Sequence, residues 1–401
     1  MVPKLRFSKF SKEWTKIRLG DYLQNYQKKV SSDTDIPVYS SSRQGLKPQA
    51  EYFADRELQN DGEYGVVPFG YITYRHMSDD NTFHFNLNNK LPEIAVSKEY
   101  PVFTGKGLNN YFLLSKLNHT DEFKLFAIQQ KAGGTRTRLY FKNLCEWRAT
   151  FPELEEQIQI SDFLSSVDER IKLLSKQYDL LCRYKKGMMQ KIFSQEVRFK
   201  DNHGRSFPKW TMRKFSDFFT IGSSKRVLQD DWVNEGVPFY RTRELVSLSK
   251  KEKFKSEIFI TEDNYTYLKD KYGVPAVGDF LVSGVGTLGI IHQVRNDNPF
   301  YFKDGNVLWF KKNNEINSDF FYHVFNSPKV LTQIVNHAAI TTVGTYTIEN
   351  AKKTKFMYPS LEEQTKIANF LSSLDDKIAV KKAELDKLKT WKQGLLQQMF
   401  V

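Results

Sequence analysis

The 401-residue sequence is poor in the residues that build disulfides and metal sites. It has two cysteines, Cys145 and Cys182, and seven histidines that are scattered along the chain. No apolar run approaches the roughly 20 residues that a membrane span needs, and the first residues lack the apolar core of a signal peptide. Two cysteines without metal-type spacing fit a reducing compartment. We therefore expect a cytoplasmic protein with no membrane segment and no bound metal.

Catalytic motifs are also missing. There is no P-loop, no HExxH and no GxSxG. The segment Gly284–Gly289 matches the dinucleotide fingerprint GxGxxG, but the residues that follow it, Ile290–Val294, predict a strand and not a helix, so no helix N-terminus is there to hold a pyrophosphate. We interpret it as a glycine turn between strands. Asp297–Phe300 resembles part of an adenine methyltransferase signature without its second proline, and we predict a turn there too.

The chain contains two copies of one predicted helical sequence, 207 residues apart. Residues 151–193 and 358–400 align without a gap, and 18 of 43 positions are identical. Weaker echoes precede each copy: Arg6 before Trp14 corresponds to Arg198 before Trp210. Repetition on this scale indicates two similar halves. A molecule of two similar halves can carry pseudo-two-fold symmetry, which suits duplex DNA as a target.

Both copies of the helix have the apolar pattern of a coiled coil. Pro152 and Pro359 precede glutamate-rich first turns, which favours helix starts there. Apolar residues then recur every 3.5 positions, and lysines such as Lys185 and Lys392 interrupt the seam. We predict that the two helices pack antiparallel. Gly187 and Gly394 occupy the same position in each copy, and we expect a close backbone approach or a bend there.

The segments between the helices carry almost all of the net charge of +13. Residues 1–150 hold 22 basic against 16 acidic side chains, and residues 196–357 hold 24 against 18. This basicity favours a polyanionic partner. The predicted fold class is α+β (mixed α/β), with four parts: a mixed domain at 1–150, a helix at 151–195, a second mixed domain at 196–357 and a second helix at 358–401. Strands are expected at 65–74, 108–114, 279–282, 290–294 and 306–310, and short helices at 121–130 and 318–336.

Basic, aromatic and hydroxyl side chains cluster in both predicted domains. Arginine can bind guanine through two hydrogen bonds, and hydroxyl groups can bind phosphates. The candidate DNA-binding residues in the first half are Ser41, Ser42, Arg43, Tyr74, Arg75, His76, Thr135, Arg136 and Arg138. Those in the second half are Arg241, Thr242, Arg243, Ser283, Thr287, Thr345 and Tyr346.

The repeated LEEQ…FLSS stretch, present as Leu154–Gln157 and Leu361–Gln364 with the residues that follow, resembles the specificity subunits of type I restriction-modification systems. The resemblance covers the full length. It implies two target recognition domains, related by a pseudo-two-fold axis and joined by long helices packed as an antiparallel coiled coil. Val237–Thr242 and the glycine turn also resemble features of that family's recognition domains, whereas the first domain departs from them.

The same resemblance implies a non-catalytic subunit. Each recognition domain would read one half of a bipartite double-stranded DNA site, and the helices would set the gap between the half-sites. The partners it implies are two methyltransferase subunits and two motor-nuclease subunits. This chain would bind no cofactor of its own, and S-adenosylmethionine is expected on the methyltransferase partners.

Two other functions are compatible with the residues. One is a coiled-coil scaffold whose basic domains bind something other than DNA. The other is a self-contained DNA methyltransferase or nuclease, against which the missing catalytic motifs argue. Methyl transfer by the pure chain would favour the enzyme, and DNA binding without a bipartite preference would favour the scaffold.

Overall fold

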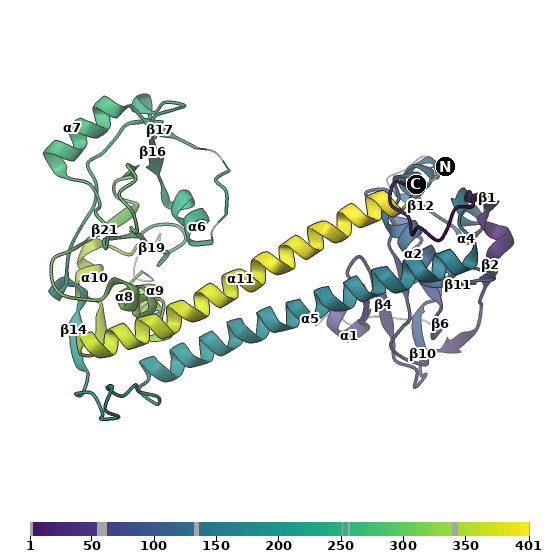
Figure 1. The fold of residues 1–401 in the computed structure, drawn as a ribbon, viewed down its shortest axis with the longest axis horizontal. Helices are drawn as coiled ribbons and strands as arrows, with labels where there is room; N and C mark the ends of the chain where they lie inside the picture. Colours follow the sequence, from purple (N-terminus) through teal and green to yellow (C-terminus); the bar gives the residue numbers. More distant parts are fainter. Residues whose placement is uncertain are drawn as a thin grey trace. The chain divides into compact units, whose positions relative to one another are not determined.

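The computed structural model describes residues 3–53, 62–131, 136–250, 252–255, 257–338 and 344–400. The chain divides into two compact units. Unit 1 consists of residues 1–176 and 383–401, and unit 2 consists of residues 177–382. Each unit mixes helices with short, mostly antiparallel strands and takes one part from each of the two long helices (Figure 1). The predicted mixed fold class is confirmed.

Unit 1 is built from several small sheets and short helices. Two sheets form its framework: a four-stranded one of order β2-β11-β7-β9 and a three-stranded one of order β10-β6-β3. The strands are β1 (Thr15–Arg18), β2 (Leu23–Asn25), β3 (Lys29–Ser31), β4 (Tyr39–Ser42), β5 (Gly45–Pro48), β6 (Glu63–Pro68), β7 (Ile72–Tyr74), β8 (Met77–Ser78), β9 (Phe85–Leu87), β10 (Glu93–Ser97), β11 (Val102–Gly105), β12 (Thr137–Arg138) and β13 (Arg148–Phe151). The helices are η1 (Leu19–Tyr22), α1 (Gln49–Phe53), α2 (Asn110–His119), α3 (Asp121–Gln129) and α4 (Phe141–Leu144).

Unit 2 also has a four-stranded and a three-stranded sheet, with strands and helices of different lengths. Its four-stranded sheet has the order β15-β21-β18-β19, and a three-stranded sheet has the order β17-β16-β20. The strands are β14 (Thr211–Lys214), β15 (Phe219–Gly222), β16 (Val237–Tyr240), β17 (Phe259–Ile260), β18 (Phe280–Ser283), β19 (Ile291–Gln293), β20 (Tyr301–Phe302), β21 (Val307–Lys312) and β22 (Lys355–Tyr358). The helices are η2 (Phe215–Asp217), η3 (Gln229–Asp231), α6 (Thr242–Lys250), α7 (Glu262–Tyr272), α8 (Ser318–Phe325), α9 (Pro328–Ala338) and α10 (Ile348–Lys353).

The two long helices are α5 (Leu154–Phe193) and α11 (Leu361–Met399), and they pack together as the periodicity predicted. In unit 1 the beginning of α5 lies against the end of α11, so the helices run antiparallel there: Lys392 Nζ donates to Asp168 Oδ1 at 2.6 Å. In unit 2 the end of α5 lies against the beginning of α11, and Lys185 Nζ donates to Asp375 Oδ1 at 2.5 Å. Lys185 and Lys392, which interrupt the apolar seam, are therefore paired with carboxylates of the other helix.

The repeated LEEQ motif anchors each long helix to its own unit. Arg6 donates to Glu156 through Nε and Nη2, both at 2.7 Å, and Trp14 Nε1 lies 3.4 Å from the same carboxylate. Unit 2 has the same network: Arg198 donates to Glu363 at 3.1 and 2.7 Å, and Trp210 Nε1 donates at 2.8 Å. Both glutamates are fully buried, so these charges need the arginines as counter-ions.

The glutamine of the motif fixes a neighbouring helix in each unit. Gln157 Oε1 accepts from the backbone N–H of Asn109, the N-cap of α2, at 3.0 Å. Gln364 Oε1 likewise accepts from the backbone N–H of Asn317, the N-cap of α8, at 3.0 Å. The repeat seen in the sequence thus extends to individual hydrogen bonds.

Most predicted elements are present, but the strand expected at 108–114 and the close approach expected as one alternative at the two helix glycines are wrong. Residues 108–114 were expected to form a strand, but α2 begins at Asn110, because the Asn109 side chain accepts from two N–H groups of its first turn. No close approach exists at Gly187 or Gly394, since a Cβ on either residue would meet no other atom within 4 Å, and both helices continue past the glycine.

The GxGxxG segment forms the expected turn between β18 and β19. Gly286 has φ = 79°, a left-handed conformation that favours glycine. A Cβ on Gly284 would come within 2.9 Å of the Tyr346 carbonyl oxygen. The glycines therefore serve the turn and its contact with the segment before α10, and no helix N-terminus follows them.

Candidate nucleic-acid interface

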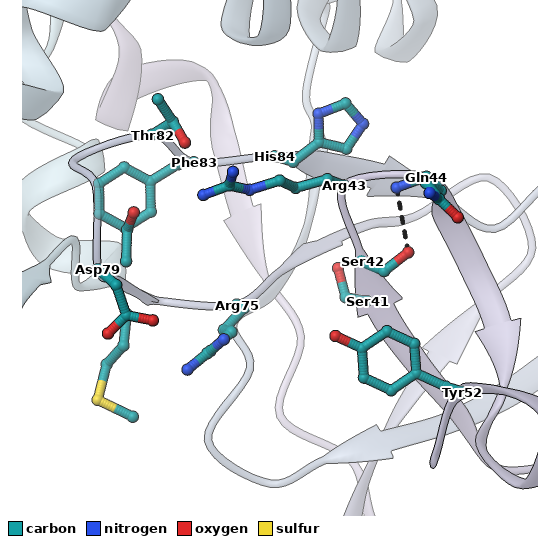
Figure 2. A pocket seen from close by; sticks show the side chains of 12 residues that line it. Ser41, Ser42, Arg43, Gln44, Tyr52, Arg75, Asp79, Thr82, Phe83 and His84 are labelled. Atoms are coloured by element: carbon teal, nitrogen blue, oxygen red, sulfur yellow. Dashed lines mark hydrogen bonds between the residues drawn. The ribbon is translucent and has the colours of Figure 1, made fainter. Parts of the chain in front are cut away.

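In unit 1, the β4–β5 hairpin and the β7–β9 segment enclose a polar pocket of about 290 Å³ (Figure 2). Its lining carries three of the predicted candidates from the hairpin and one from the end of β7, together with hydroxyl, acidic and aromatic groups. Figure 2 shows Arg43 extending from the hairpin toward Thr82 and Phe83, with Arg75 on the opposite wall. The lining residues are Ser41, Ser42, Arg43, Gln44, Tyr52, Arg75, Met77, Ser78, Asp79, Thr82, Phe83 and His84.

Adjacent aspartates hold two of the arginines at the rim of this pocket. Arg43 Nη2 lies 2.5 Å from Asp80 Oδ1, and Arg136 Nε lies 2.7 Å from Asp79 Oδ1. The Thr82 hydroxyl, followed by Arg43, lowers the pKa of Asp80, which is therefore ionised at neutral pH. All four charged side chains are about half exposed or more, so the ion pairs are weak and an anionic ligand can compete for the arginines.

The stretch Tyr74–His76 separates into buried and exposed side chains. Tyr74 is fully buried and its hydroxyl donates to the Leu139 carbonyl at 3.0 Å. His76 is also buried, stacks on Tyr140, and has its pKa lowered by burial, so it is neutral at pH 7. Only Arg75 is exposed. Tyr74 and His76 do not line the pocket, and they support the wall that presents Arg75.

The two hairpin serines have internal partners. Ser41 is buried and its Oγ accepts from Asn86 Nδ2 at 2.8 Å. Ser42 Oγ donates to the Gly45 carbonyl at 2.8 Å and accepts from the Gln44 N–H at 3.1 Å, the contact drawn in Figure 2. These hydroxyls shape the turn that carries Arg43.

At the corresponding point of the repeat, unit 2 places a different set of side chains. Strand β16 ends at Tyr240, and Glu244 in the first turn of α6 accepts hydrogen bonds from both Arg241 and Arg243. Glu244 is only 4% exposed, and hydrogen bonds from the two arginines keep its pKa below the ordinary value although burial opposes this. The Thr242 hydroxyl between the arginines is buried.

The glycine turn of unit 2 lies next to the segment before α10. Ser283 is buried and its hydroxyl donates to the Thr287 carbonyl at 2.5 Å. Thr345 pairs with Val285 in a β-bridge. Tyr346 is buried and its hydroxyl bonds to Thr354 at 2.7 Å. Of these predicted candidates, Thr287 alone is exposed, while Ser283 and Tyr346 build the turn.

The structure thus brings most predicted arginines to the surface and turns several hydroxyl and aromatic candidates inward. Arg136 and Arg138 are exposed beside β8, a pocket wall that pairs with β12. Thr135 lies outside the described residues. The carboxylates that hold the arginines are not among the residues predicted from the sequence. Glu244 stands three positions after Arg241, so a signal existed, but Asp79 and Asp80 meet partners distant in sequence.

Neither a metal site nor a membrane-spanning helix is found in the part of the chain that the structure describes. No group of three or more histidine, cysteine or acidic side chains is placed to hold a metal ion. Among the same residues, no helix is long and apolar enough to cross a membrane.

The chain belongs to the type I restriction modification DNA specificity domain family, whose sequence profile matches residues 11–182 and again residues 208–390. The two matches coincide with the two halves of the internal repeat. The recognition made from the LEEQ motif is confirmed.

Individual relatives agree with the family. One, from Methanocaldococcus jannaschii, is named as a type I restriction enzyme MjaX specificity subunit; it is 25% identical over 99% of this chain and 97% of its own length. The MjaVIII specificity subunit of the same organism is 27% identical over 64% of this chain and 61% of its own length.

Solved structures show the same fold. The type I restriction-modification S subunit from M. genitalium matches with a TM-score of 0.63 and 17% identity, over 100% of this chain and 99% of its own. A chain from a study of complex assembly and conformational transition in the type I R-M system matches with a TM-score of 0.55 and 13% identity, over 97% of each chain.

Proposed function

We propose that this chain is the DNA-reading subunit of a type I restriction-modification complex and that each unit reads one half of a bipartite site. One observation carries this proposal: corresponding points of the two units present arginines held by carboxylates, Arg43 with Asp80 in unit 1 and Arg243 with Glu244 in unit 2. Arginine is the side chain best suited to read guanine in the major groove. Family membership supports DNA as the ligand.

The two half-sites are unlike in this proposal, because the two units share a framework and differ in what they present. The Arg–Glu–Trp and Gln–Asn contacts are the same in both. At the corresponding point after β4 or β16, however, unit 1 offers a polar pocket and unit 2 offers a buried glutamate with two arginines. Different donor patterns select different base pairs, so the full site is asymmetric.

The paired helices set the gap between the half-sites. A helix rises about 1.5 Å per residue, and base pairs are about 3.4 Å apart, so helix length sets how far apart two readers stand on DNA. Seven residues inserted into both α5 and α11 keep the 3.5-residue seam facing its partner. The insertion adds about 10 Å, equal to about three base pairs of gap.

The outer faces of these helices dock the methyltransferase subunits. Exposed apolar side chains recur along α5 at Leu173, Leu180 and Tyr184, each about half exposed. On α11, Val380 and Trp391 are similarly exposed. Apolar side chains exposed on a helix that already buries another face are typical of an interaction surface. The methyltransferase subunits supply S-adenosylmethionine chemistry on adenine, motor-nuclease subunits complete the complex, and this chain is not catalytic.

Methylome sequencing of cells with and without the gene tests the proposal. We expect one bipartite adenine-methylation motif to vanish when the gene is deleted. The seven-residue insertion in both helices should lengthen the gap and keep both half-sites. No lost motif on deletion would refute the DNA-reading role, and a changed half-site after the insertion would refute the spacer role of the helices.

A further inference from the structure

Glu244 holds two arginines that differ strongly in exposure. Arg241 donates to the Glu244 carboxylate through Nε at 3.0 Å and Nη2 at 2.7 Å, and the Arg241 backbone N–H donates to it at 2.9 Å. Arg243 donates to it through Nε at 2.7 Å. The Arg241 side chain is 19% exposed, whereas that of Arg243 is 54% exposed.

These contacts assign different roles to the two arginines. Arg241 precedes the first residue of α6 and its guanidinium lies over the Trp232 ring at 5.5 Å. With two side-chain bonds and one backbone bond to Glu244, it closes the start of the helix, as in a capping box. It also neutralises a carboxylate that burial would otherwise make costly. Arg241 therefore stabilises the start of α6 and the buried Glu244 carboxylate.

We propose that Arg243 reads a guanine in the half-site recognised by unit 2 and that Glu244 is the positioning residue that orients it; this inference rests on the function proposed above. A guanidinium has five N–H donors in a planar fork, and guanine offers O6 and N7 side by side. The bond from Nε to Glu244 sets the plane of the fork. It also reduces the side-chain entropy that the arginine loses on binding.

The charge balance of this cluster favours base reading over phosphate binding. Two arginines share one buried carboxylate, so the cluster carries one net positive charge and not two. A phosphate contact depends mainly on net charge and on counter-ion release. A base contact depends on donor direction, and direction is what the buried carboxylate supplies.

Unit 1 offers a contrast at the corresponding place. Arg43 is held by Asp80, whose side chain is 48% exposed, against 4% for Glu244. An exposed carboxylate holds its partner weakly. The fixed orientation is therefore a property of the unit 2 cluster and not of every exposed arginine in the chain.

The test compares variants of the full chain in cells that make the whole complex. The methylome of each strain reports base preference at each position of the site. Arg243→Ala and Arg243→Lys remove the two-pronged contact on an exposed side chain, and Glu244→Gln removes the carboxylate charge. Arg295→Ala is the matched control, because Arg295 is 60% exposed and also donates to a carboxylate, Asp319, at 2.9 Å.

We expect both Arg243 variants to relax one G·C position in one half-site. The preference there should fall about 5- to 150-fold, the value of one good bidentate contact. Glu244→Gln should relax the same position, which a purely structural role would not do, since that would lower methylation at all positions together. Arg295→Ala should leave the motif unchanged.

Binding of the assembled complex to its site at several salt concentrations gives a second measure. Loss of a base contact leaves the slope of log K against log salt unchanged, whereas loss of a phosphate contact reduces it by about 1. A reduced slope for Arg243→Ala, equal loss at all positions, or a relaxed position that is not G·C would overturn the inference. If the unmodified chain specified no bipartite motif, the proposed function itself would fall first.

Discussion

Removing Arg198 while leaving Glu363 in place should destabilise unit 2 more than almost any other single change. The Glu363 side chain is fully buried, and Arg198 provides two of its hydrogen bonds, with Trp210 providing a third. Arg198→Met leaves a buried carboxylate that has lost the one counter-ion found for it among the described residues. Breaking such a pair from one side costs about 3–5 kcal/mol.

The stability of the double variant Arg198→Met/Glu363→Met, compared with that of the single variant, shows whether the unpaired buried charge causes the loss. Removing both charges leaves the Trp210 N–H without its acceptor, which costs about 1–3 kcal/mol. The double variant should therefore be more stable than the single one. Lys9→Ala is the control at a helix start, since Lys9 and Glu155 form an ion pair with both side chains more than half exposed, worth less than about 1 kcal/mol.

Urea unfolding of the purified full chain, followed by tryptophan fluorescence, measures these changes. With an m value of about 3 kcal/mol per molar, the midpoint of the unit 2 transition should fall by about 1–1.7 M for Arg198→Met. Arg6→Met should lower the unit 1 transition in the same way, because Arg6 and Glu156 form the equivalent pair. A loss below 1 kcal/mol, or a double variant less stable than the single one, would refute the reasoning.

Three further outcomes follow from the helices and their neighbours. Gly187→Ala and Gly394→Ala should each stabilise the chain by about 0.5–1 kcal/mol, since a Cβ meets no other atom there; thermal unfolding checks this, and a lowered midpoint would indicate crowding. Lys185→Asp should destabilise unit 2 by placing like charges together, and adding Asp375→Lys should restore it, as a double-mutant cycle in urea would show. Burial lowers the pKa of His323 to about 4, below its unfolded value of about 6.5, so the unfolded state binds the proton first and His323 alone lowers the stability by about 2 kcal/mol between pH 6.5 and 5. His323→Gln should reduce the pH dependence of the urea midpoint by this share and leave the share of His292, whose pKa burial also lowers to about 4.

The periodic parts of the fold could be predicted from the sequence because their cause is local. The 3.5-residue seam and the preceding prolines placed both long helices to within a few residues of their observed bounds. The reason for the glutamates was missed. Their place in the first turn indicates charges that complement the helix dipole, whereas Glu156 is buried against Arg6, 150 residues earlier. The repeated arginine and tryptophan were visible in the sequence, but their meeting with glutamate depends on the tertiary fold.

In the candidate site, too, features with a local cause could be predicted and features that depend on the tertiary fold could not. Exposed arginines could be predicted, because their charge and the turns around them favour the surface. The sequence does not show that Tyr74, Ser283 and Tyr346 are buried and not at the surface. A hydroxyl that stabilises a turn or a core looks the same in sequence as one that binds a ligand. Each has an internal hydrogen-bond partner in the structure, and these partners lie on segments that only folding brings near.

The contrast between framework and site gives a physical reason for the pattern of repetition. A buried carboxylate tolerates no change in its partner, so the Arg6–Glu156 and Arg198–Glu363 pairs are the same in both units. Arg43 on the hairpin pairs with a half-exposed carboxylate, and in unit 2 Arg241 already neutralises the buried Glu244, so the exposed Arg43 and Arg243 carry no such constraint from folding. They can differ between the units at little cost in stability, and this freedom lets one framework, used twice in a chain, present two unlike surfaces to DNA.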